Sequence, residues 1–300
     1  MRGHLRGHLR RQLASPLGRE DFLTGLVSLA PTVLVTLVFV VFPVFFSLHL
    51  SFHRWDILRA AKPFVGLSNF AAMFSDEEFW KALGNTAFYT VGVVPVQAAV
   101  ALGLALLLNR PIRGRDVYRT AYFMPVITSS IVAAVVWTWI YNPQYGMINT
   151  ALRMLGVAGP NWLLDPQLAL PSVMAMSVWK NVGYHLVIFL AGLQSIPRSL
   201  YESADIDGAG AGSQFRHITW PLLRPTTGLV FISGMIFSFQ VFGPVYVMTG
   251  GGPMRSTTVL LYYIYQQGFE LRRMGYASAV AWIVFLIIFD VLVFQQFAGV

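Results

Sequence analysis

The sequence predicts an all-α membrane protein with six transmembrane helices. Of its 300 residues, 56% are apolar and 11% are charged, whereas soluble domains average about 45–50% apolar and about 25% charged residues. The apolar residues gather into six runs with few or no charges, each near the ~20 residues that cross a bilayer. The chain contains no cysteine, which excludes disulfides and thiolate chemistry.

The six predicted spans are residues 22–50, 84–108, 118–141, 168–193, 226–248 and 276–297. Prolines occur in or near several of them, and membrane helices tolerate proline where neighbouring helices satisfy the freed backbone groups. The first run follows a basic segment, residues 1–21, as in a signal peptide. A signal peptide's apolar region is only about 7–15 residues long. We therefore expect a basic tail, 1–21, and a membrane domain, 22–300, that keeps the first helix.

Lysine and arginine counts predict the orientation of the chain. With the N-terminus inside, segments 1–21, 109–117 and 194–225 hold 11 of these residues, against 8 in the longer outside loops. The positive-inside rule then places both termini in the cytoplasm. The same bias accounts for the net charge of +8, so nucleic-acid binding is not favoured.

Catalytic motifs are absent from the sequence. It has no G-x-x-x-x-G-K-[ST], H-E-x-x-H or G-x-S-x-G pattern, and the first of these absences argues against ATP binding by this chain. His4 and His8 have helical spacing but lie in the basic tail, and we expect no metal there. His185 lies within a predicted span, where a hydrogen-bonded packing role is expected.

Apart from Arg119 at the inner end of the third predicted span, two charged residues fall inside the predicted spans, Lys180 and Asp290. Intramembrane charges are costly and usually face a cavity or the bundle interior. For Asp290 we favour a structural or interfacial role. Around Lys180, the stretch SVWKNVGY suits either a wet, sugar-sized cavity or interhelical polar contacts. The candidate ligand contacts are Ser177, Lys180, Asn181 and Tyr184 in the fourth span and Ser238 and Gln240 in the fifth.

One long polar stretch, residues 196–225, interrupts the apolar runs. Ser199 and Glu202 match a capping box, with Pro197 just ahead. We expect a short helix over 200–207 that ends at Gly208, the usual residue for a left-handed cap. A second short helix is expected over 212–218, and Pro221 and Pro225 are expected to separate it from the fifth span. Helix–helix connections usually take 2–8 residues, so a capped elbow of this length indicates a docking element for a cytoplasmic partner.

The stretch YESADIDGAGAGSQFRHITWPLLRP, residues 201–225, closely resembles the EAA loop of ABC importer permeases. Similarity to the carbohydrate-uptake branch, which includes permeases for maltose, lactose and glycerol-3-phosphate, extends over roughly residues 22–295. It is carried by segments such as LALLLNRPIRGRDVYRTAYFMP (104–125), WTWIYNPQYGMIN (137–149) and YVMTGGGPMRSTT (246–258).

The resemblance implies the type I ABC importer permease fold and a transporter subunit without enzymatic activity. It implies that the EAA loop docks on a separate ATPase, which binds the ATP and magnesium. The implied coupling residues are Tyr201, Glu202, Ser203, Ala204, Asp207, Gly208 and Ala209. Glu202 would also pair with a basic ATPase residue, and a larger side chain at Gly208 should uncouple transport.

The resemblance also implies an assembly in a bacterial or archaeal cytoplasmic membrane. Its partners would be a second, different permease, two ATPases and an extracytoplasmic binding protein, with the TGGGP segment (249–253) and the 142–167 loop as candidate contacts for the latter. The implied cargo is a sugar or related polyol, because neutral hydrogen-bonding groups beside aromatics suit hydroxyl-rich ligands. Lys180 could instead favour an anionic cargo such as glycerol-3-phosphate or a glycerophosphodiester. An ATP-independent carrier or channel is the alternative.

Overall fold

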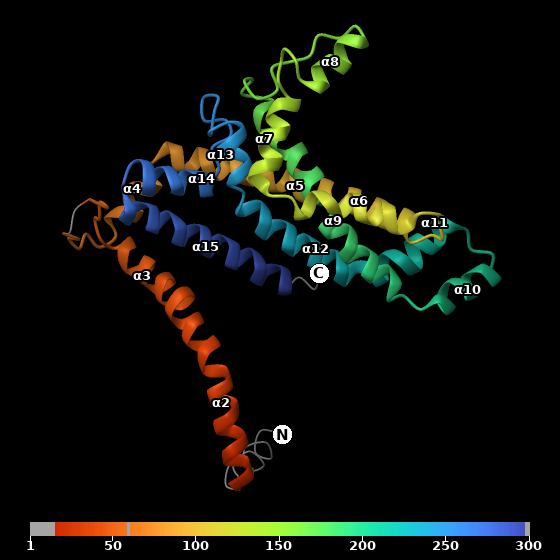
Figure 1. Cartoon of the computed structure of the whole chain (residues 1–300), viewed down its shortest axis with the longest axis horizontal. Helices are drawn as coiled ribbons and strands as arrows, with labels where there is room; N and C mark the ends of the chain where they lie inside the picture. Colours follow the sequence, from red (N-terminus) through yellow and green to blue (C-terminus); the bar gives the residue numbers. More distant parts are fainter. Residues whose placement is uncertain (1–15, 59–60, 298–300) are drawn as a thin grey trace.

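Helices dominate the part of the chain that the structure describes. The computed structural model describes residues 16–58 and 61–297; most of the basic tail, with His4 and His8, lies outside it. Within these residues the extended pairings are two isolated bridges, His53–Phe64 and Asp56–Arg273. The helices (Figure 1) are α2 (Pro16–Thr36), η1 (Leu37–Val41), α3 (Phe42–Ser51), α4 (Ser68–Phe74), α5 (Glu77–Leu108), α6 (Arg115–Ile127), α7 (Ser130–Ile140), α8 (Met147–Met154), α9 (Ala169–Gln194), α10 (Arg198–Ile206), α11 (Ala211–Gln214), η2 (Phe215–Thr219), α12 (Trp220–Phe239), α13 (Gly243–Met248), α14 (Leu260–Tyr265), η3 (Gln266–Glu270) and α15 (Met274–Phe297).

Four predicted spans are confirmed as long apolar helices. The first is the continuous run α2–η1–α3, which contains one π-helical turn, and the second, fourth and sixth are α5, α9 and α15. α5 begins seven residues before the predicted start because Asp76 caps it, accepting from the Glu78 amide at 2.9 Å. Glu77 and Glu78 then place negative charge in its first turn, where the helix dipole favours it.

The third span was predicted as one straight helix. The structure instead has two helices there, α6 and α7. α6 and α7 meet at 99°, because Thr128 and Ser129 adopt extended backbone conformations with ψ of 143° and 134°. Pro125 lies just upstream and lacks the amide hydrogen that would continue the helical ladder. Together, α6 and α7 are long and apolar enough to form one bent membrane span.

The predicted bounds of the fifth span, 226–248, are wrong at both ends. The expected separation at Pro221 and Pro225 does not occur, since α11, the π-helical turn η2 and α12 form one run from Ala211 to Phe239. Pro221 lies two residues after the π-helical turn η2, inside this run, and membrane helices tolerate such a proline where neighbouring helices satisfy the freed backbone group. The helix breaks instead after Phe239, and α13 begins at Gly243.

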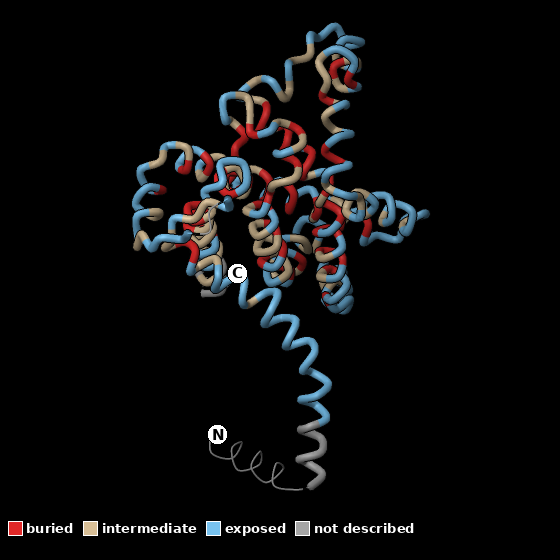
Figure 2. Tube along the Cα trace, turned by 60° about the vertical axis from the view of Figure 1, so that its left-hand side comes forward, coloured by how far each residue is buried: buried red, intermediate tan, exposed pale blue. Residues whose placement is uncertain are grey.

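α9 is the central helix of the bundle, and glycines let its neighbours approach closely. A Cβ at Gly183 would lie 2.1 Å from the Tyr122 carbonyl oxygen of α6, and one at Gly192 would lie 2.5 Å from Thr226 Oγ1 of α12. His185 hydrogen-bonds Gln97 of α5 at 2.7 Å and Ser233 of α12 at 3.1 Å. The predicted packing role of His185 is therefore confirmed. Figure 2 shows the buried segments within the helical bundle and an exposed helix leading to the N-terminus.

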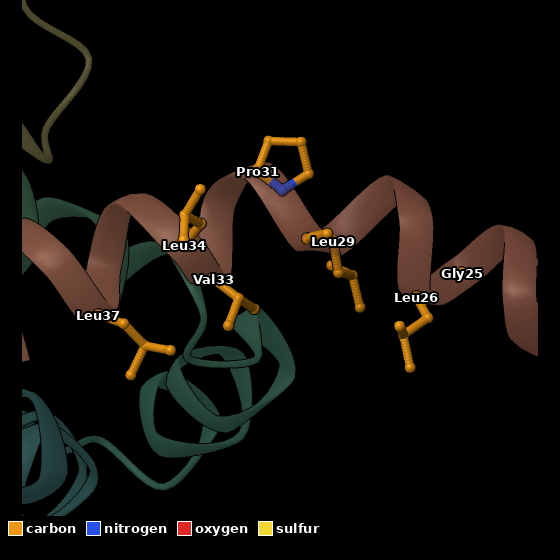
Figure 3. A pocket seen from close by; sticks show the side chains of 8 residues that line it. Gly25, Leu26, Leu29, Pro31, Val33, Leu34 and Leu37 are labelled. Atoms are coloured by element: carbon orange, nitrogen blue, oxygen red, sulfur yellow. The ribbon is translucent and has the colours of Figure 1, made fainter.

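The N-terminal part of the run α2–η1–α3, which is α2 and η1, extends away from the other helices (Figures 1 and 2), whereas α3 contacts α15, where Trp282 donates to Ser47 Oγ at 3.1 Å. Only 6% of the run's most apolar stretch is buried. The hollow along it is lined by its own side chains alone, including Leu26, Leu29 and Val33 (Figure 3). A monomer in water would not leave such a surface exposed, so it faces lipid or another protein.

Candidate functional site

A polar cavity of about 300 Å³ lies where both broken spans meet α5 and α9. Its lining contains hydroxyl, amide, ammonium and aromatic side chains. It also includes residues at the two helix breaks, Ser130 after the first and residues 240–244 at the second. The lining residues are Tyr89, Ser130, Ser177, Lys180, Asn181, Phe237, Gln240, Val241, Phe242, Gly243 and Pro244. This composition can hydrogen-bond a polar solute while aromatic faces cover its apolar side.

Four of the six predicted ligand residues line this cavity: Ser177, Lys180, Asn181 and Gln240. The first three share one face of α9 because positions three and four apart lie together on a helix. The Asn181 amide donates back to the Ser177 carbonyl at 3.1 Å, which fixes its orientation. Gln240 reaches the cavity because α12 ends there.

The other two predicted residues, Tyr184 and Ser238, do not line the cavity. The Tyr184 ring packs on Phe237, with centroids 5.5 Å apart, and Ser238 is buried with 3% exposure. Sequence reasoning missed Tyr89 and Ser130. Asn85, Thr86 and Thr90 surround Tyr89 in the sequence and were the available signal for it, and Pro125 with the following TSS segment was the signal for Ser130.

Lys180 supplies the only charged side chain in the cavity lining. The residue is 8% exposed, and its ammonium forms no hydrogen bond or ion pair with any residue that the structure describes. An unpaired buried charge is costly. Water, a solute or a neighbouring subunit must therefore offset its charge.

The polar stretch forms a compact elbow built on α10. Gly208 has φ of +75°, its amide donates to the Asp205 carbonyl at 3.1 Å, and the Ala209 amide donates to the Ala204 carbonyl at 2.8 Å. These two bonds form a Schellman motif, which favours glycine at this position. The predicted glycine cap is confirmed.

The predicted capping box is wrong. α10 begins at Arg198 with Pro197 at the N-cap and no side-chain cap bond, so Ser199 already lies within the first turn. Glu202 instead lies 3.3 Å from the Arg198 guanidinium, one turn back. Both side chains are largely exposed, and such pairs contribute little to stability, so Glu202 remains available to a partner.

The exposed surface of α10 is partly apolar. Ile206 is 88% exposed and Leu200 is 42% exposed, while Glu202, Ser203 and Asp207 are also exposed and Ala204 and Ala209 are half-buried. Sequence reasoning missed Ile206, although an isoleucine within an acidic stretch was visible.

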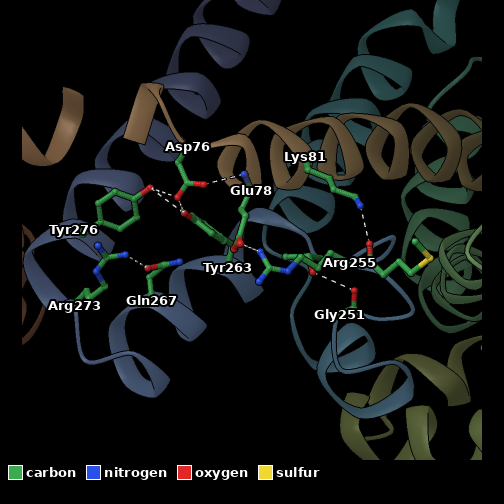
Figure 4. A network of polar contacts seen from close by, with 11 residues as sticks. Asp76, Glu78, Lys81, Gly251, Arg255, Tyr263, Gln267, Arg273 and Tyr276 are labelled. Carbon is green, nitrogen blue, oxygen red and sulfur yellow. Dashed lines mark hydrogen bonds and ion pairs between the residues drawn. The ribbon is translucent and has the colours of Figure 1, made fainter. Parts of the chain in front are cut away.

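Polar contacts hold the 249–258 loop against the start of α5 (Figure 4). Arg255 pairs with Glu78, and Lys81 donates to the Met254 carbonyl at 2.7 Å. Asn85 donates to the Arg255 and Thr258 carbonyls at 3.0 and 2.9 Å. The loop containing TGGGP is therefore a fixed feature of this surface.

A second polar cluster lies beside this loop. Asp76 Oδ2 accepts from the hydroxyls of Tyr263 at 2.5 Å and Tyr276 at 2.8 Å (Figure 4). Burial, followed by the hydrogen bond to Asp76, raises the pKa of Tyr263 well above its usual value. The hydroxyl therefore stays protonated and donates to the carboxylate that also caps α5.

Bent spans around a polar cavity, joined to a structured polar elbow, are features of a multi-pass membrane transporter. The chain belongs to the family of binding-protein-dependent transport system inner membrane components, whose sequence profile matches residues 97–298. It is an ABC transporter permease subunit, not an enzyme.

Curated relatives cover nearly the whole chain. The sn-glycerol-3-phosphate transport system permease protein UgpA of Agrobacterium fabrum is 37% identical over 273 residues, 89% of this chain and 91% of that protein. The trehalose/maltose transport system permease protein MalF of Thermococcus litoralis is 35% identical over 276 residues, 92% of this chain and 93% of that protein.

Solved structures show the same fold. A chain of a bacterial ABC transporter that imports the acidic polysaccharide alginate aligns with a TM-score of 0.82 at 24% identity, over 93% of this chain and 96% of that chain. A bacterial alginate transporter in complex with an alginate-pentasaccharide-bound periplasmic protein aligns with a TM-score of 0.81 at 24% identity, over 92% of this chain and 93% of that chain. The predicted type I importer permease fold is confirmed.

Proposed function

We propose that this chain forms half of the pathway of an ATP-driven importer for a sugar or related polyol. The observation that carries the proposal is the polar cavity, lined by Ser177, Asn181 and Gln240 at the meeting of two broken spans. Each hydroxyl of a desolvated polyol needs a hydrogen-bonding partner, and these side chains provide both donors and acceptors. The cargo named for the relative from Thermococcus litoralis, trehalose or maltose, fits this class.

The α10 elbow is the proposed contact with the ATPase, which would carry the ATP and magnesium. Ile206 would enter an apolar groove, and Glu202 and Asp207 would face basic residues at its rim, supported by their exposure. Tyr201, Ser203, Ala204, Gly208 and Ala209 would shape and hold this helix. One such elbow contacts one ATPase, so the assembly would contain two ATPases and two permeases.

The second permease would cover the exposed face of α2 and α3. This face is apolar and almost unburied, and a different partner chain, giving a heterodimer, would complete the cavity. The elbow and both termini would lie on the cytoplasmic side of a bacterial or archaeal membrane, as the lysine and arginine counts favour.

The binding protein would dock on the opposite side, at the 142–167 and 249–258 loops. The contacts of Glu78, Lys81 and Asn85 with the second loop support this, because a fixed loop loses little entropy on binding. The alignment with a transporter solved with its periplasmic protein is consistent with such a partner.

A second cargo class, an anionic polyol such as glycerol-3-phosphate or a glycerophosphodiester, is favoured by one observation. Lys180 lines the cavity without a carboxylate partner in the described chain. A phosphate would neutralise it. Uptake measured with maltose and with glycerol-3-phosphate, each supplied with the purified binding protein, separates the two classes: loss of only glycerol-3-phosphate uptake in Lys180→Met supports the anionic cargo.

Co-purification and uptake test the importer itself. We expect an ATPase to co-purify with the chain, and Gly208→Trp to abolish uptake, because a side chain at φ +75° is strained and breaks the Schellman motif. Gly210→Trp is the matched control, since Gly210 has φ of −70° and its Cβ direction is equally open. Transport without any ATPase, undiminished in Gly208→Trp, would instead establish an ATP-independent carrier.

A further inference from the structure

The two broken spans connect the elbow to the polar cavity. Ser130 follows the break between α6 and α7, and Gln240 begins the break between α12 and α13; both line the cavity. The other ends of α6 and α12 lie beside the elbow (Figure 1). Because Gly183 and Gly192 bring α9 into close contact with both helices, these three helices form one packed block.

Tyr201 joins the elbow to the start of α12. Its hydroxyl lies 2.8 Å from Thr219 Oγ1, and Thr219 is 5% exposed. The Tyr201 ring packs against the core cluster that includes Leu193 and Leu223. The side chain therefore points into the protein, away from the surface that carries Ile206.

Thr219 ends the π-helical turn η2, directly before α12. Single π-turns inside α-helices recur at functional sites. The Tyr201–Thr219 hydrogen bond therefore links α10 to the residue directly before α12. Movement of α10 would act on α12 at this turn.

Gln194 makes the corresponding link to α6. With its amide oriented as both guanidinium groups require, its oxygen accepts from Arg115 Nη2 at 3.0 Å and Arg119 Nη2 at 2.9 Å. Gln194 is the last residue of α9, four positions before α10 begins, and Arg115 is the first residue of α6. The two arginines thus connect the root of the elbow to the first broken span.

We propose that Tyr201 and Gln194 are positioning residues that transmit movement of α10 to the two breaks around the cavity. The inference rests on the proposed docking of α10 on an ATPase. Tyr201 would act through Thr219 on α12, and Gln194 through Arg119 and Arg115 on α6. Neither residue contacts the cargo, which distinguishes both from the residues lining the cavity.

The test uses the complete importer in nanodiscs and needs no identified cargo. The chain has no cysteine, so spin labels at introduced cysteines replacing exposed Leu229 on α12 and Tyr145 beyond α7 report movement across the breaks. Distances are measured with and without trapped ATP. Transmission through the Tyr201–Thr219 bond requires that bond to be stronger in the ATP-shifted state. Tyr201→Phe removes the bond and should therefore lower the ratio of ATP-shifted to resting conformers about fivefold.

Matched variants separate transmission from general damage. Thr219→Val should give the same fall, and Tyr201→Phe with Thr219→Val should fall no further than either alone. Gln194→Leu should reduce the shift, whereas Gln194→Glu, which keeps an acceptor for both arginines, should restore it. Tyr118→Phe removes an exposed hydroxyl nearby and should behave as wild type.

The outcomes are distinct. If no ATPase binds the wild-type chain, the proposed function itself fails. If the ATPase binds and ATP shifts the distances equally in wild type, Tyr201→Phe and Gln194→Leu, transmission through these contacts is refuted. A fall in Tyr118→Phe as large as in Tyr201→Phe also refutes it, since the effect would then not depend on Thr219.

Discussion

Gly183→Ala tests the central packing of the bundle. The added Cβ would lie 2.1 Å from the Tyr122 carbonyl oxygen and 3.0 Å from Phe123 Cα. These are backbone atoms, so no side chain can rotate away, and α6 and α9 must separate by roughly 1 Å to restore ordinary contact. Overpacking of this kind costs about 1–3 kcal/mol, and we expect a value near the upper end because the neighbour is rigid.

Reversible unfolding of the reconstituted chain by steric trapping measures this cost directly. Gly103→Ala on α5 is the control, because its Cβ would have no atom within 4 Å. That change should stabilise its helix by up to about 1 kcal/mol, as alanine is the better helix former. Equal stability of Gly183→Ala and wild type, within about 0.5 kcal/mol, would show that α6 and α9 do not approach as described.

Three further predictions concern the loops. Asn149 is 2% exposed and bonds the Pro143 and Pro160 carbonyls and Trp162 Nε1, so Asn149→Ala should cost about 2–3 kcal/mol and speed limited proteolysis within 142–167. Glu78→Gln breaks an exposed pair with Arg255 and should change stability by less than about 1 kcal/mol, whereas a larger loss in thermal unfolding would mean that the pair is shielded. Because the pKa of Tyr263 is raised from its ordinary value near 10, its contribution is present below pH 10 and lost as the pH rises further; alkaline unfolding should be shallower in Tyr263→Phe.

Composition was sufficient to predict the spans but not their breaks. Pro95 lies inside α5, which remains one helix, and Pro225 lies inside α12. Pro125 lies beside a 99° bend. The same residue type has two outcomes, a continuous helix or a bend, because neighbouring helices and local hydrogen bonds decide whether the chain continues. The residue pattern of one span does not show which helices pack against it, so the breaks could not be predicted from it.

The elbow shows the same limit at shorter range. Gly208 was predictable because only a positive φ closes the helix there. The capping box at Ser199 and Glu202 was not reliable, since the helix already begins at Arg198, directly after Pro197, and no side chain caps it.

The two breaks that the sequence did not predict and the position of the polar cavity have one cause. Irregular backbone at membrane depth leaves polar groups without helical partners, and it is tolerated only where it is buried in protein or lines a wet cavity. The break at Thr128 and Ser129 and the break after Phe239 therefore each require such a place. One cavity, bordered by Ser130 and Gln240, serves both. Two broken spans that converge are thus a stronger indicator of a transport pathway than any single polar residue within a span.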